Sequence, residues 1–262
     1  MRSHNVREVV AAGGCAVNAW MSTDSPYLAE ALSHAGFDSV TVDAQHGMFG
    51  RDTLVHLLQA ISAGPATPMV RPTSVDAAEI GWLLDAGAYG IIAPSVDTPD
   101  LARQLVKACR YPPVGHRSFG PSRGLLYGGT DYLAEADHTI TAWAMIESAQ
   151  ALENLSEIAA VPGLFGLYIG PNDLALDLGH TPGGRIGETI AQHCRNIRDA
   201  AHRHGLAVGV FCADGDEAAT WREAGFDLVT PGNDLSMMRA EATRRIGHVR
   251  QQSTSTIAGS GY

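Results

Sequence analysis

The sequence predicts an α/β fold, a single-domain (β/α)8 TIM barrel, on the basis of two observations. Short apolar runs typical of buried strands alternate with amphipathic stretches, and no shift in composition divides the 262 residues. Eight strand-then-helix units in series favour a parallel sheet closed into a barrel. An open doubly wound sheet is the alternative, but no GxGxxG motif follows the first predicted strand.

The predicted strands are short apolar runs, and the helices between them carry apolar residues at spacings of three and four. In chain order the predicted strands are residues 15–20, 39–43, 68–71, 89–94, 139–147, 164–170, 207–212 and 227–231. The predicted helices are residues 26–35, 52–63, 75–86, 99–109, 149–159, 186–204, 217–224 and 235–246. Gly36, Gly87 and Gly225 each stand where a helix needs a left-handed C-cap before a strand.

Two segments fall outside this alternation. Residues 111–131 are rich in Gly, Pro and Arg, and we expect either a functional insertion or a surface loop there. Residues 1–250 form the predicted barrel domain, and the polar, small residues 251–262 are expected to be a flexible C-terminal tail.

Composition limits the possible partners and location. The hydrophobic content of 45% and charged content of 18% are typical of a globular chain. A formal charge of -10 argues against a nucleic-acid partner, which needs a basic surface. No apolar run reaches the roughly 18 residues of a membrane span, and the start lacks the apolar stretch of a secretory signal. The four scattered cysteines, without a CxxC pair, predict a reduced, cytoplasmic protein.

Two carboxylates at the ends of neighbouring strands indicate a cation site. Glu147 ends the fifth predicted strand and Asp173 lies just past the sixth. In a barrel, the carboxyl ends of the strands form one face that carries the active site. Two carboxylates plus waters suit Mg²⁺ or Mn²⁺, whereas zinc prefers His or Cys ligands. The alternative is that each acid pairs with an arginine such as Arg117 or Arg123.

The ends of the second and third strands add a base-like pair and a cation. Asp43 and His46 lie three residues apart, so the carboxylate can fix one imidazole nitrogen and make the other a proton acceptor. Arg71, held before Pro72, can neutralise a carboxylate or a developing enolate oxygen. The alternatives are that His46 caps the next helix and that Arg71 forms a structural salt bridge with Asp43 or Glu147.

The turn after the sixth strand has a second possible use. Gly170, Pro171, Asn172 and Asp173 lead from the strand into a helix, and the backbone N–H groups of such a turn form an anion site for a carboxylate or phosphate. Asp85, near the end of the third predicted helix, is expected to be either a solvated surface residue or a functional one.

Taken together, these positions resemble the HpcH/HpaI family of metal-dependent pyruvate aldolases. The matching segments are FDSVTVDAQHG at residues 37–47, VRP at 70–72, IE at 146–147 and IGPNDL at 169–174, within a similarity running from about residue 15 to 245. The resemblance implies reversible cleavage of 4-hydroxy-2-oxo acids to pyruvate and an aldehyde. It also implies Mg²⁺, Mn²⁺ or Co²⁺ on Glu147 and Asp173.

The resemblance assigns roles to the remaining residues. It implies that Arg71 stabilises the enolate and that His46, oriented by Asp43, transfers a proton. The substrate carboxylate is expected to rest on the N–H groups near Asn172 and Asp173. A homohexamer, a trimer of dimers with the last helix packed on a neighbour, is implied as well, and in it Asp85 is expected near an adjacent subunit's site.

Two departures from the family pattern concern the substrate side of the site. Gln45 stands where many relatives carry Glu before the histidine, and Met145 stands where they often carry Gln, two positions before the metal Glu. The metal ligands are intact. These departures are expected to affect which aldehyde the site accepts and how it binds the keto oxygen of the substrate.

The lysine content separates the possible aldolase mechanisms. Lys107 is the only lysine and falls in the middle of a predicted helix, away from any strand end. A metal-free aldolase needs a lysine that forms a Schiff base, so the electrophilic role falls to a metal. The alternatives are a lyase for citryl- or malyl-CoA, whose nucleotide needs basic residues such as Arg117 and Arg123 near the mouth, and a non-catalytic barrel that binds a small acid.

Overall fold

The computed structural model describes residues 1–257, with side chains through Arg250, and shows a closed barrel of eight parallel strands. Each strand pairs with the next along the chain, and β8 pairs with β1 to close the ring. The predicted fold class is confirmed. The strands are β1 (Ala16–Met21), β2 (Ser39–Asp43), β3 (Thr67–Arg71), β4 (Gly90–Ala93), β5 (Thr141–Ile146), β6 (Gly166–Ile169), β7 (Ala207–Cys212) and β8 (Leu228–Pro231).

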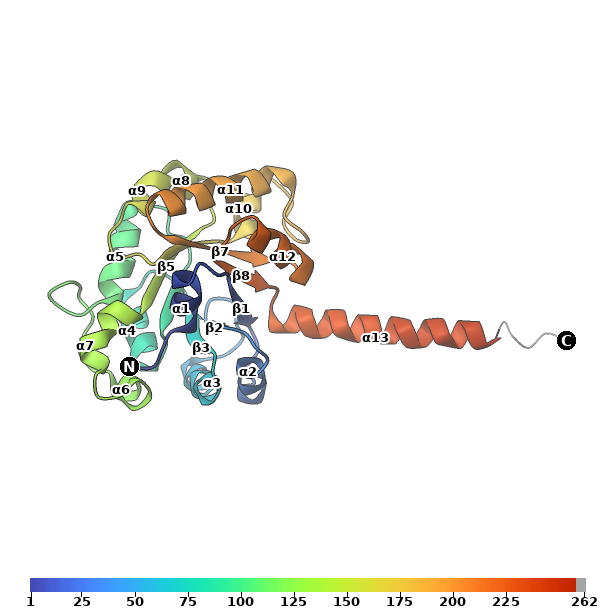
Figure 1. The fold of residues 1–262 in the computed structure, drawn as a ribbon, viewed down its shortest axis with the longest axis horizontal. Coiled ribbons are helices and arrows are strands. Elements are labelled where there is room, and N and C mark those ends of the chain that lie inside the picture. Colours follow the sequence, from blue (N-terminus) through green and yellow to red (C-terminus); the bar gives the residue numbers. More distant parts are fainter. Residues whose placement is uncertain (258–262) are drawn as a thin grey trace.

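Helices surround the barrel and connect its strands (Figure 1). They are α1 (Asn5–Ala11), α2 (Pro26–Ser33), α3 (Arg51–Ala63), α4 (Ala77–Asp85), α5 (Pro99–Cys109), α6 (Ser122–Gly128), α7 (Tyr132–Thr139), α8 (Ala149–Glu153), α9 (Leu155–Ala159), α10 (Pro171–Asp177), α11 (Glu188–Arg203), α12 (Gly215–Glu223) and α13 (Asp234–Ile257). All eight predicted helical regions contain a helix. Among the described residues, no helix combines the length and apolar character needed to cross a membrane.

The structure adds short helices that the sequence pattern does not reveal. Helices α1, α6, α7 and α10 have seven or eight residues each, and the apolar spacing of the sequence did not identify them. The predicted irregular segment 111–131 contains α6. The predicted helix 149–159 is two helices, α8 and α9, which meet at Asn154, where the side chain donates a hydrogen bond to the backbone oxygen of Asp97 at 2.8 Å.

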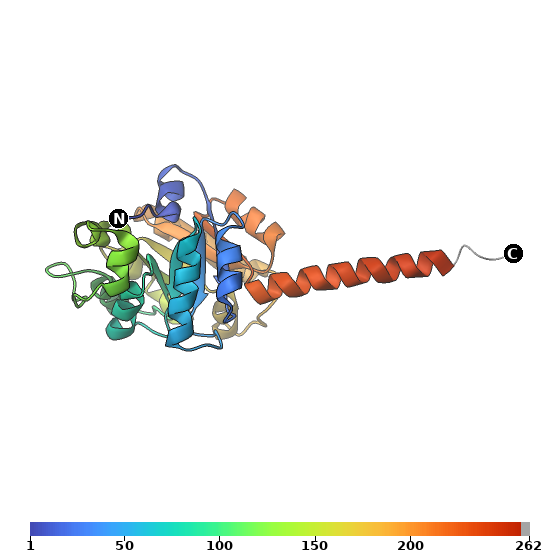
Figure 2. The same cartoon turned by 90° about the horizontal axis from the view of Figure 1, so that it is seen from below.

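The last helix extends away from the barrel. Figures 1 and 2, related by a quarter turn, both show α13 projecting from the body. It continues beyond the predicted end at residue 246 and includes residues 251–257 of the segment expected to be a flexible tail. The rest of that segment, 258–262, lies outside the described residues.

Buried side chains form two packed regions, one between the barrel and its helices and one inside the barrel. The interior group includes Trp20, Met69, Trp143, Met145 and Tyr168, all buried. Large side chains that fill the interior make the barrel a packed core rather than a channel. The mouth above Met145 and Tyr168 therefore has an apolar floor.

A buried polar network joins four strands inside the barrel. The Asn18 side-chain amide on β1 donates to Thr230 Oγ1 on β8 at 3.0 Å, and its Oδ1 accepts hydrogen bonds from Ser39 Oγ at 2.7 Å and Thr41 Oγ1 at 2.9 Å on β2. Tyr168 on β6 donates to Thr230 Oγ1 at 2.7 Å. Asn18 therefore satisfies three hydroxyl groups that are shielded from water.

Replacing Asn18 with Ala is expected to lower the free energy of unfolding by about 2–4 kcal/mol, because buried hydroxyl groups lose their partner. Urea denaturation followed by circular dichroism measures the change. The matched control is Asn196→Ala, at an exposed position on α11, with an expected change under about 0.5 kcal/mol. Equal losses in the two variants would contradict a stabilising role for the network.

Candidate active site

One cavity at the carboxyl ends of the strands brings together the residues predicted for the site, apart from Asp85. Its volume is about 320 Å³. The predicted residues that line it are Asp43, His46, Arg71, Glu147, Gly170, Pro171, Asn172 and Asp173. They come from β2, β3, β5 and β6 and the turns that follow, so strand order in the barrel brings together residues far apart in the sequence.

Strand register pairs Asp43 with Arg71. These last residues of β2 and β3 lie directly opposite each other in the sheet. Arg71 Nε donates to Asp43 Oδ1 at 2.9 Å and Arg71 Nη2 donates to Oδ2 at 2.6 Å, which is a bidentate ion pair. The Arg71 guanidinium also lies 4.9 Å from the ring centre of Trp20, whose indole N–H donates to Asp43 Oδ2 at 3.2 Å.

This pairing fixes the charge of Asp43. Burial by itself raises the pKa of the Asp43 carboxyl, but the hydrogen bonds and charge of Arg71 together with the Trp20 N–H hold the pKa below its usual value. Asp43 is therefore a buried, ionised partner of Arg71. The structural salt bridge considered as an alternative for Arg71 is present.

The predicted orientation of the His46 ring by Asp43 differs from the geometry. Asp43 Oδ1 accepts hydrogen bonds from the backbone N–H groups of Gln45 and His46, each at 3.2 Å, and Arg71 occupies both carboxylate oxygens. Within the described part of the chain, the His46 ring makes no hydrogen bond. Asp43 thus fixes the backbone of the turn that carries His46, and the exposed imidazole faces the cavity.

Glu147 is held by one carboxylate oxygen. Its Oε1 accepts hydrogen bonds from the Ser95 backbone N–H at 2.7 Å and from Ser95 Oγ at 3.3 Å. Ser95, just after β4, has φ of 51°, a left-handed conformation that aims its N–H at the carboxylate. Oε2 of Glu147 remains without a hydrogen bond among the described residues.

The electrostatics of Glu147 favour a cation beside it. Glu147 is only 7% exposed. Burial raises the pKa of the Glu147 carboxyl, which outweighs the lowering by the Ser95 N–H, and the charge of Asp173 raises it further. A divalent cation between the two acids would relieve both the burial cost and the repulsion.

On the side that faces Gly170, the structure leaves no room beside the Glu147 side chain. Glu147 and Gly170 follow Ile146 and Ile169, which are opposite each other in β5 and β6. A Cβ at position 170 would clash with Oε2 of Glu147 and lie 3.1 Å from its Cβ. The Glu147 side chain can therefore keep its position only if residue 170 is glycine.

The donor set fits a hard divalent cation. The described residues contain no group of three or more His, Cys, Asp and Glu side chains arranged to hold a metal, so Glu147 and Asp173 would be the side-chain ligands. Two carboxylate ligands leave coordination positions for water and a chelating substrate, as Mg²⁺ and Mn²⁺ sites commonly do. Neither acid pairs with Arg117 or Arg123 among the described residues.

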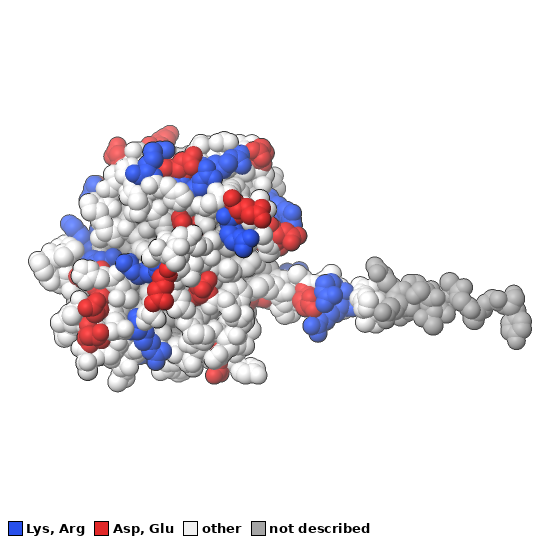
Figure 3. Space-filling model, viewed as in Figure 1, with Lys and Arg blue, Asp and Glu red and all other residues white. Residues whose placement is uncertain are grey.

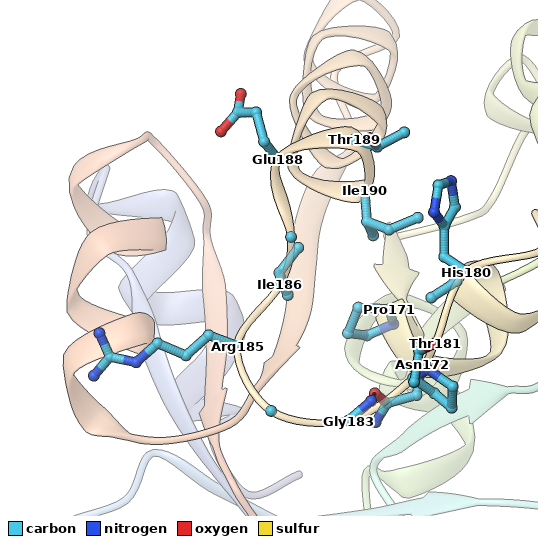
Figure 4. Close-up of a pocket in the computed structure, with 14 residues that line it drawn as sticks. Pro171, Asn172, His180, Thr181, Gly183, Arg185, Ile186, Glu188, Thr189 and Ile190 are labelled. Atoms are coloured by element: carbon cyan, nitrogen blue, oxygen red, sulfur yellow. Dashed lines mark hydrogen bonds between the residues drawn. The ribbon is translucent and has the colours of Figure 1, made fainter.

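A neighbouring loop fixes the turn at Asn172. The N–H of Gly183 donates to Asn172 Oδ1 at 2.9 Å, and the loop between α10 and α11 encloses a second cavity of about 210 Å³ that shares Pro171 and Asn172 with the first. Figure 4 shows Asn172 beside Gly183, while Arg185 points away toward another helix. The backbone N–H of Asn172, in the first turn of α10, has no partner within the helix and is left for a ligand.

The structure places Asp85 and the arginines of the 111–131 segment away from the mouth. Asp85 ends α4, which runs back to the start of β4, and its Oδ1 accepts a hydrogen bond from Arg117 Nη2 at 2.8 Å. Burial raises the pKa of Asp85, although Arg117 lowers it in part. Arg123 Nη1 donates to the backbone oxygen of Ala86 at 2.6 Å, at the same end. Asp85, Arg117 and Arg123 therefore do not line the active-site cavity of their own chain.

The sequence interpretation missed several residues that line the cavity or support it. Those that line the cavity are Trp20, Ser22, Tyr168, Phe211 and Asn233. Ser95 supports the cavity indirectly, through its hydrogen bond to Glu147. All six lie within two residues of the carboxyl end of a strand, and five of them belong to β1, β4, β7 and β8, whose last residues are uncharged. Their positions near strand ends were the feature of the sequence that could have identified these residues.

The fold and site define a (β/α)8 barrel enzyme with an acid pair, an arginine and a histidine at one mouth. A family model described as HpcH/HpaI aldolase/citrate lyase matches residues 17–240. The chain belongs to this family.

Relatives and solved structures agree with the family. The chain is 43% identical over 239 residues to a hydroxypyruvate/pyruvate aldolase of Rhizorhabdus wittichii, covering 91% of this chain and 95% of the relative. It is 32% identical to a 4-hydroxy-2-oxo-heptane-1,7-dioate aldolase of Escherichia coli, covering 98% of each. A crystal structure of an HpcH/HpaI aldolase/citrate lyase family protein from Burkholderia cenocepacia superimposes with a TM-score of 0.87 at 31% identity, covering 94% of this chain and 98% of that one. The chain is a carbon–carbon lyase.

Replacing Gly170 with Ala is expected to lower kcat/KM for carbon–carbon cleavage by about 100-fold, because the new methyl group displaces the Glu147 carboxylate. Steady-state kinetics measures the effect. The control is Gly215→Ala at the start of α12, where a Cβ meets no atom within 4 Å and activity should stay unchanged. Wild-type activity in Gly170→Ala would show that Glu147 does not need its present position.

Proposed function

We propose that the chain is a metal-dependent aldolase that reversibly cleaves 4-hydroxy-2-oxo acids to an aldehyde and pyruvate, or a related 2-oxo acid such as hydroxypyruvate. The observation that carries the proposal is the grouping of Glu147, Asp173, Arg71 and His46 around one cavity. The hydroxypyruvate/pyruvate aldolase and 4-hydroxy-2-oxo-heptane-1,7-dioate aldolase relatives support the substrate class.

Glu147 and Asp173 would hold the divalent cation, Mg²⁺, Mn²⁺ or Co²⁺. When bound, the cation supplies Lewis-acid polarisation of the keto group of a chelating 2-oxo acid. Ser95 keeps Oε1 of Glu147 occupied, which leaves Oε2, beside Gly170, for the cation. The backbone N–H groups of Asn172 and Asp173, in the first turn of α10, would receive the substrate carboxylate.

Arg71 is placed to take up negative charge on the substrate. Asp43 holds its Nε and Nη2, which leaves Nη1 without a partner among the described residues. In the cleavage direction the C4 hydroxyl loses a proton, the C3–C4 bond breaks, and its electrons move toward the C2 oxygen. A guanidinium N–H at that oxygen would stabilise the developing charge.

His46 is the group available for proton transfer at this mouth. Its exposed ring lines the cavity without a hydrogen bond inside the described chain, so it can reach the C4 hydroxyl or C3 directly or through water. Lys107, exposed on α5, does not line the cavity and offers no Schiff base.

The apolar part of the cavity lining bears on the choice of substrate. Trp20, Met145, Tyr168 and Phe211 line it, and Met145 stands where relatives often carry Gln. Gln45 lies on the adjoining rim, with its Oε1 buried and without a hydrogen-bond partner. We propose that these two positions tune how the keto oxygen and the aldehyde are received.

The geometry weakens the acyl-CoA alternative. Arg117 and Arg123, the residues considered for a nucleotide, lie at the opposite end of the barrel and are held by Asp85 and by the Ala86 backbone oxygen. Figure 3 views the molecule from the α1 side, the end at which these two arginines lie, and shows acidic and basic side chains interspersed there without a continuous basic track. A nucleotide at the mouth would meet Arg71 and no second arginine among the described lining residues.

We propose a trimer of dimers in the cytoplasm. Leu235, Met238 and Ile246 on the projecting α13 are 45%, 57% and 50% exposed, which suits a helix packed on a neighbouring copy. Asp85 would approach an adjacent subunit's site in such an assembly. The four cysteines carry no disulfide, in keeping with a reducing compartment.

Removing the cation or its ligands is expected to abolish pyruvate release from 4-hydroxy-2-oxo acids. EDTA-treated protein, Glu147→Gln and Asp173→Asn should each lose at least about 1,000-fold in kcat, because the carbonyl loses its electrophile. A lactate dehydrogenase-coupled assay measures pyruvate, and Mg²⁺ or Mn²⁺ should restore only the EDTA-treated wild type. Glu153→Gln, at an exposed position on α8, is the matched control. Full turnover by metal-free protein would refute the proposal.

Replacing His46 with Ala is expected to slow exchange of the pyruvate methyl protons with deuterium by about 100-fold, since a positioned acid–base group is removed. Proton NMR in deuterium oxide follows the exchange. Metal affinity, measured by calorimetry, should stay close to the wild-type value because His46 is not a proposed ligand. His56→Ala, at an exposed position on α3, is the control. Undiminished exchange would remove His46 from the mechanism.

A further inference from the structure

A separate cavity of about 320 Å³ lies at the other end of the barrel, where the strands begin. Helix α1 closes this end, since Val6 packs into the barrel interior with the buried cluster that includes Trp143. The cavity is bounded by α1, the end of α5, α7 and the residues that precede β6 and β7. It shares no lining residue with the catalytic mouth.

Two arginines face this cavity, and no carboxylate pairs with either one in the described chain. Arg110, at the end of α5, is only 7% exposed. Its Nη1 and Nη2 donate to the backbone oxygens of Cys109 and Gly163 at 3.4 and 3.3 Å, which are long hydrogen bonds to neutral acceptors. Arg7 makes neither a hydrogen bond nor an ion pair there, and its guanidinium lies 5.1 Å from the Phe165 ring centre.

The nearest acid does not neutralise this pair. Asp137 lines the cavity, but its Oδ1 accepts a hydrogen bond from the Tyr111 backbone N–H at 3.1 Å, and its carboxylate lies beyond ion-pair distance of both arginines. His138 also lines the cavity, from α7. Two guanidinium groups and one carboxylate leave an excess of positive charge.

The electrostatic cost of this arrangement is visible at Arg7. Burial lowers the pKa of the Arg7 guanidinium, and the charge of Arg110 lowers it further. Like charges held together out of bulk water repel, and the repulsion is relieved when a counter-charge enters between them. Arg71, at the catalytic mouth, shows how such a charge is compensated, since Asp43 forms an ion pair with it.

We propose that Arg7 and Arg110 form a binding site for a small dianionic oxyanion, either inorganic phosphate or the phosphate end of a small phosphomonoester. Guanidinium groups present planar pairs of N–H donors that match the oxygens of phosphate. The cavity volume exceeds that of a phosphate ion, so an ester substituent also fits. The site is independent of the aldol chemistry at the other end.

Calorimetric titration tests the site, with wild-type protein loaded with Mg²⁺ and saturated with pyruvate so that the catalytic anion site is occupied. Inorganic phosphate, at constant ionic strength, is expected to bind with one site per chain. Glycerol 3-phosphate serves as the phosphomonoester, and the tighter of the two ligands identifies the source of the phosphate group. Chloride in place of phosphate should give no heat of binding.

Arg7→Gln is expected to weaken binding at least about tenfold, because charge-assisted hydrogen bonds are lost. The fold should persist, since Arg7 has no hydrogen-bond partner in the described chain. Arg110→Gln should weaken binding as much, and circular dichroism shows whether this buried change leaves the protein folded. The matched control is Arg103→Gln on α5, where an exposed arginine pairs with Asp100, and binding there should equal that of the wild type.

Crystals grown with selenate, a dianion with a strong anomalous signal, locate the site directly. The expected anomalous peak lies between the Arg7 and Arg110 guanidinium groups. Unchanged phosphate affinity in Arg7→Gln, equal weakening in Arg103→Gln, or a selenate peak confined to the catalytic mouth would each overturn the proposal. None of these results depends on aldolase turnover.

Discussion

The active-site geometry depends on the register of the parallel strands. Asp43 lies opposite Arg71 on β2 and β3, and the pair Ile146–Ile169 places Glu147 beside Gly170 at the ends of β5 and β6. A shift of one residue in either strand pair would turn these side chains to the other face of the sheet. The buried interior and the Asn18 network therefore help to hold the site together from below.

The pKa values of the two buried acids at this mouth shift in opposite directions because their hydrogen-bond partners differ. Asp43 receives the Arg71 fork and the Trp20 indole N–H, so its pKa is lowered and it stays charged within the protein. Glu147 receives one backbone N–H and a long hydroxyl contact, so burial and the Asp173 charge raise its pKa. The first acid is neutralised by the chain and serves to position Arg71. The second has no cationic partner of this kind in the described chain, which is why we propose it as a ligand of the cation.

Local patterns in the sequence predicted the barrel and most of the residues that line the cavity, because apolar runs, helix spacing and charged strand ends are local features. The sequence left the partner of Arg71 open between Asp43 and Glu147, since the choice depends on the register between strands 28 residues apart. The role of Ser95 depends on a positive φ that nothing in its neighbours reveals. Trp20 was missed because an aromatic residue in an apolar run is indistinguishable from core.

The placement of arginines separates the two ends of the barrel. Among the described residues that line the mouth, Arg71 is the only lysine or arginine, and Asp43 already neutralises it. A 2-oxo acid entering this cavity therefore finds no net positive charge from the chain, which agrees with the proposed divalent cation on Glu147 and Asp173. At the opposite end, Arg7 and Arg110 have no carboxylate partner in the described chain, so a second anion can be accommodated there without competing for the cation.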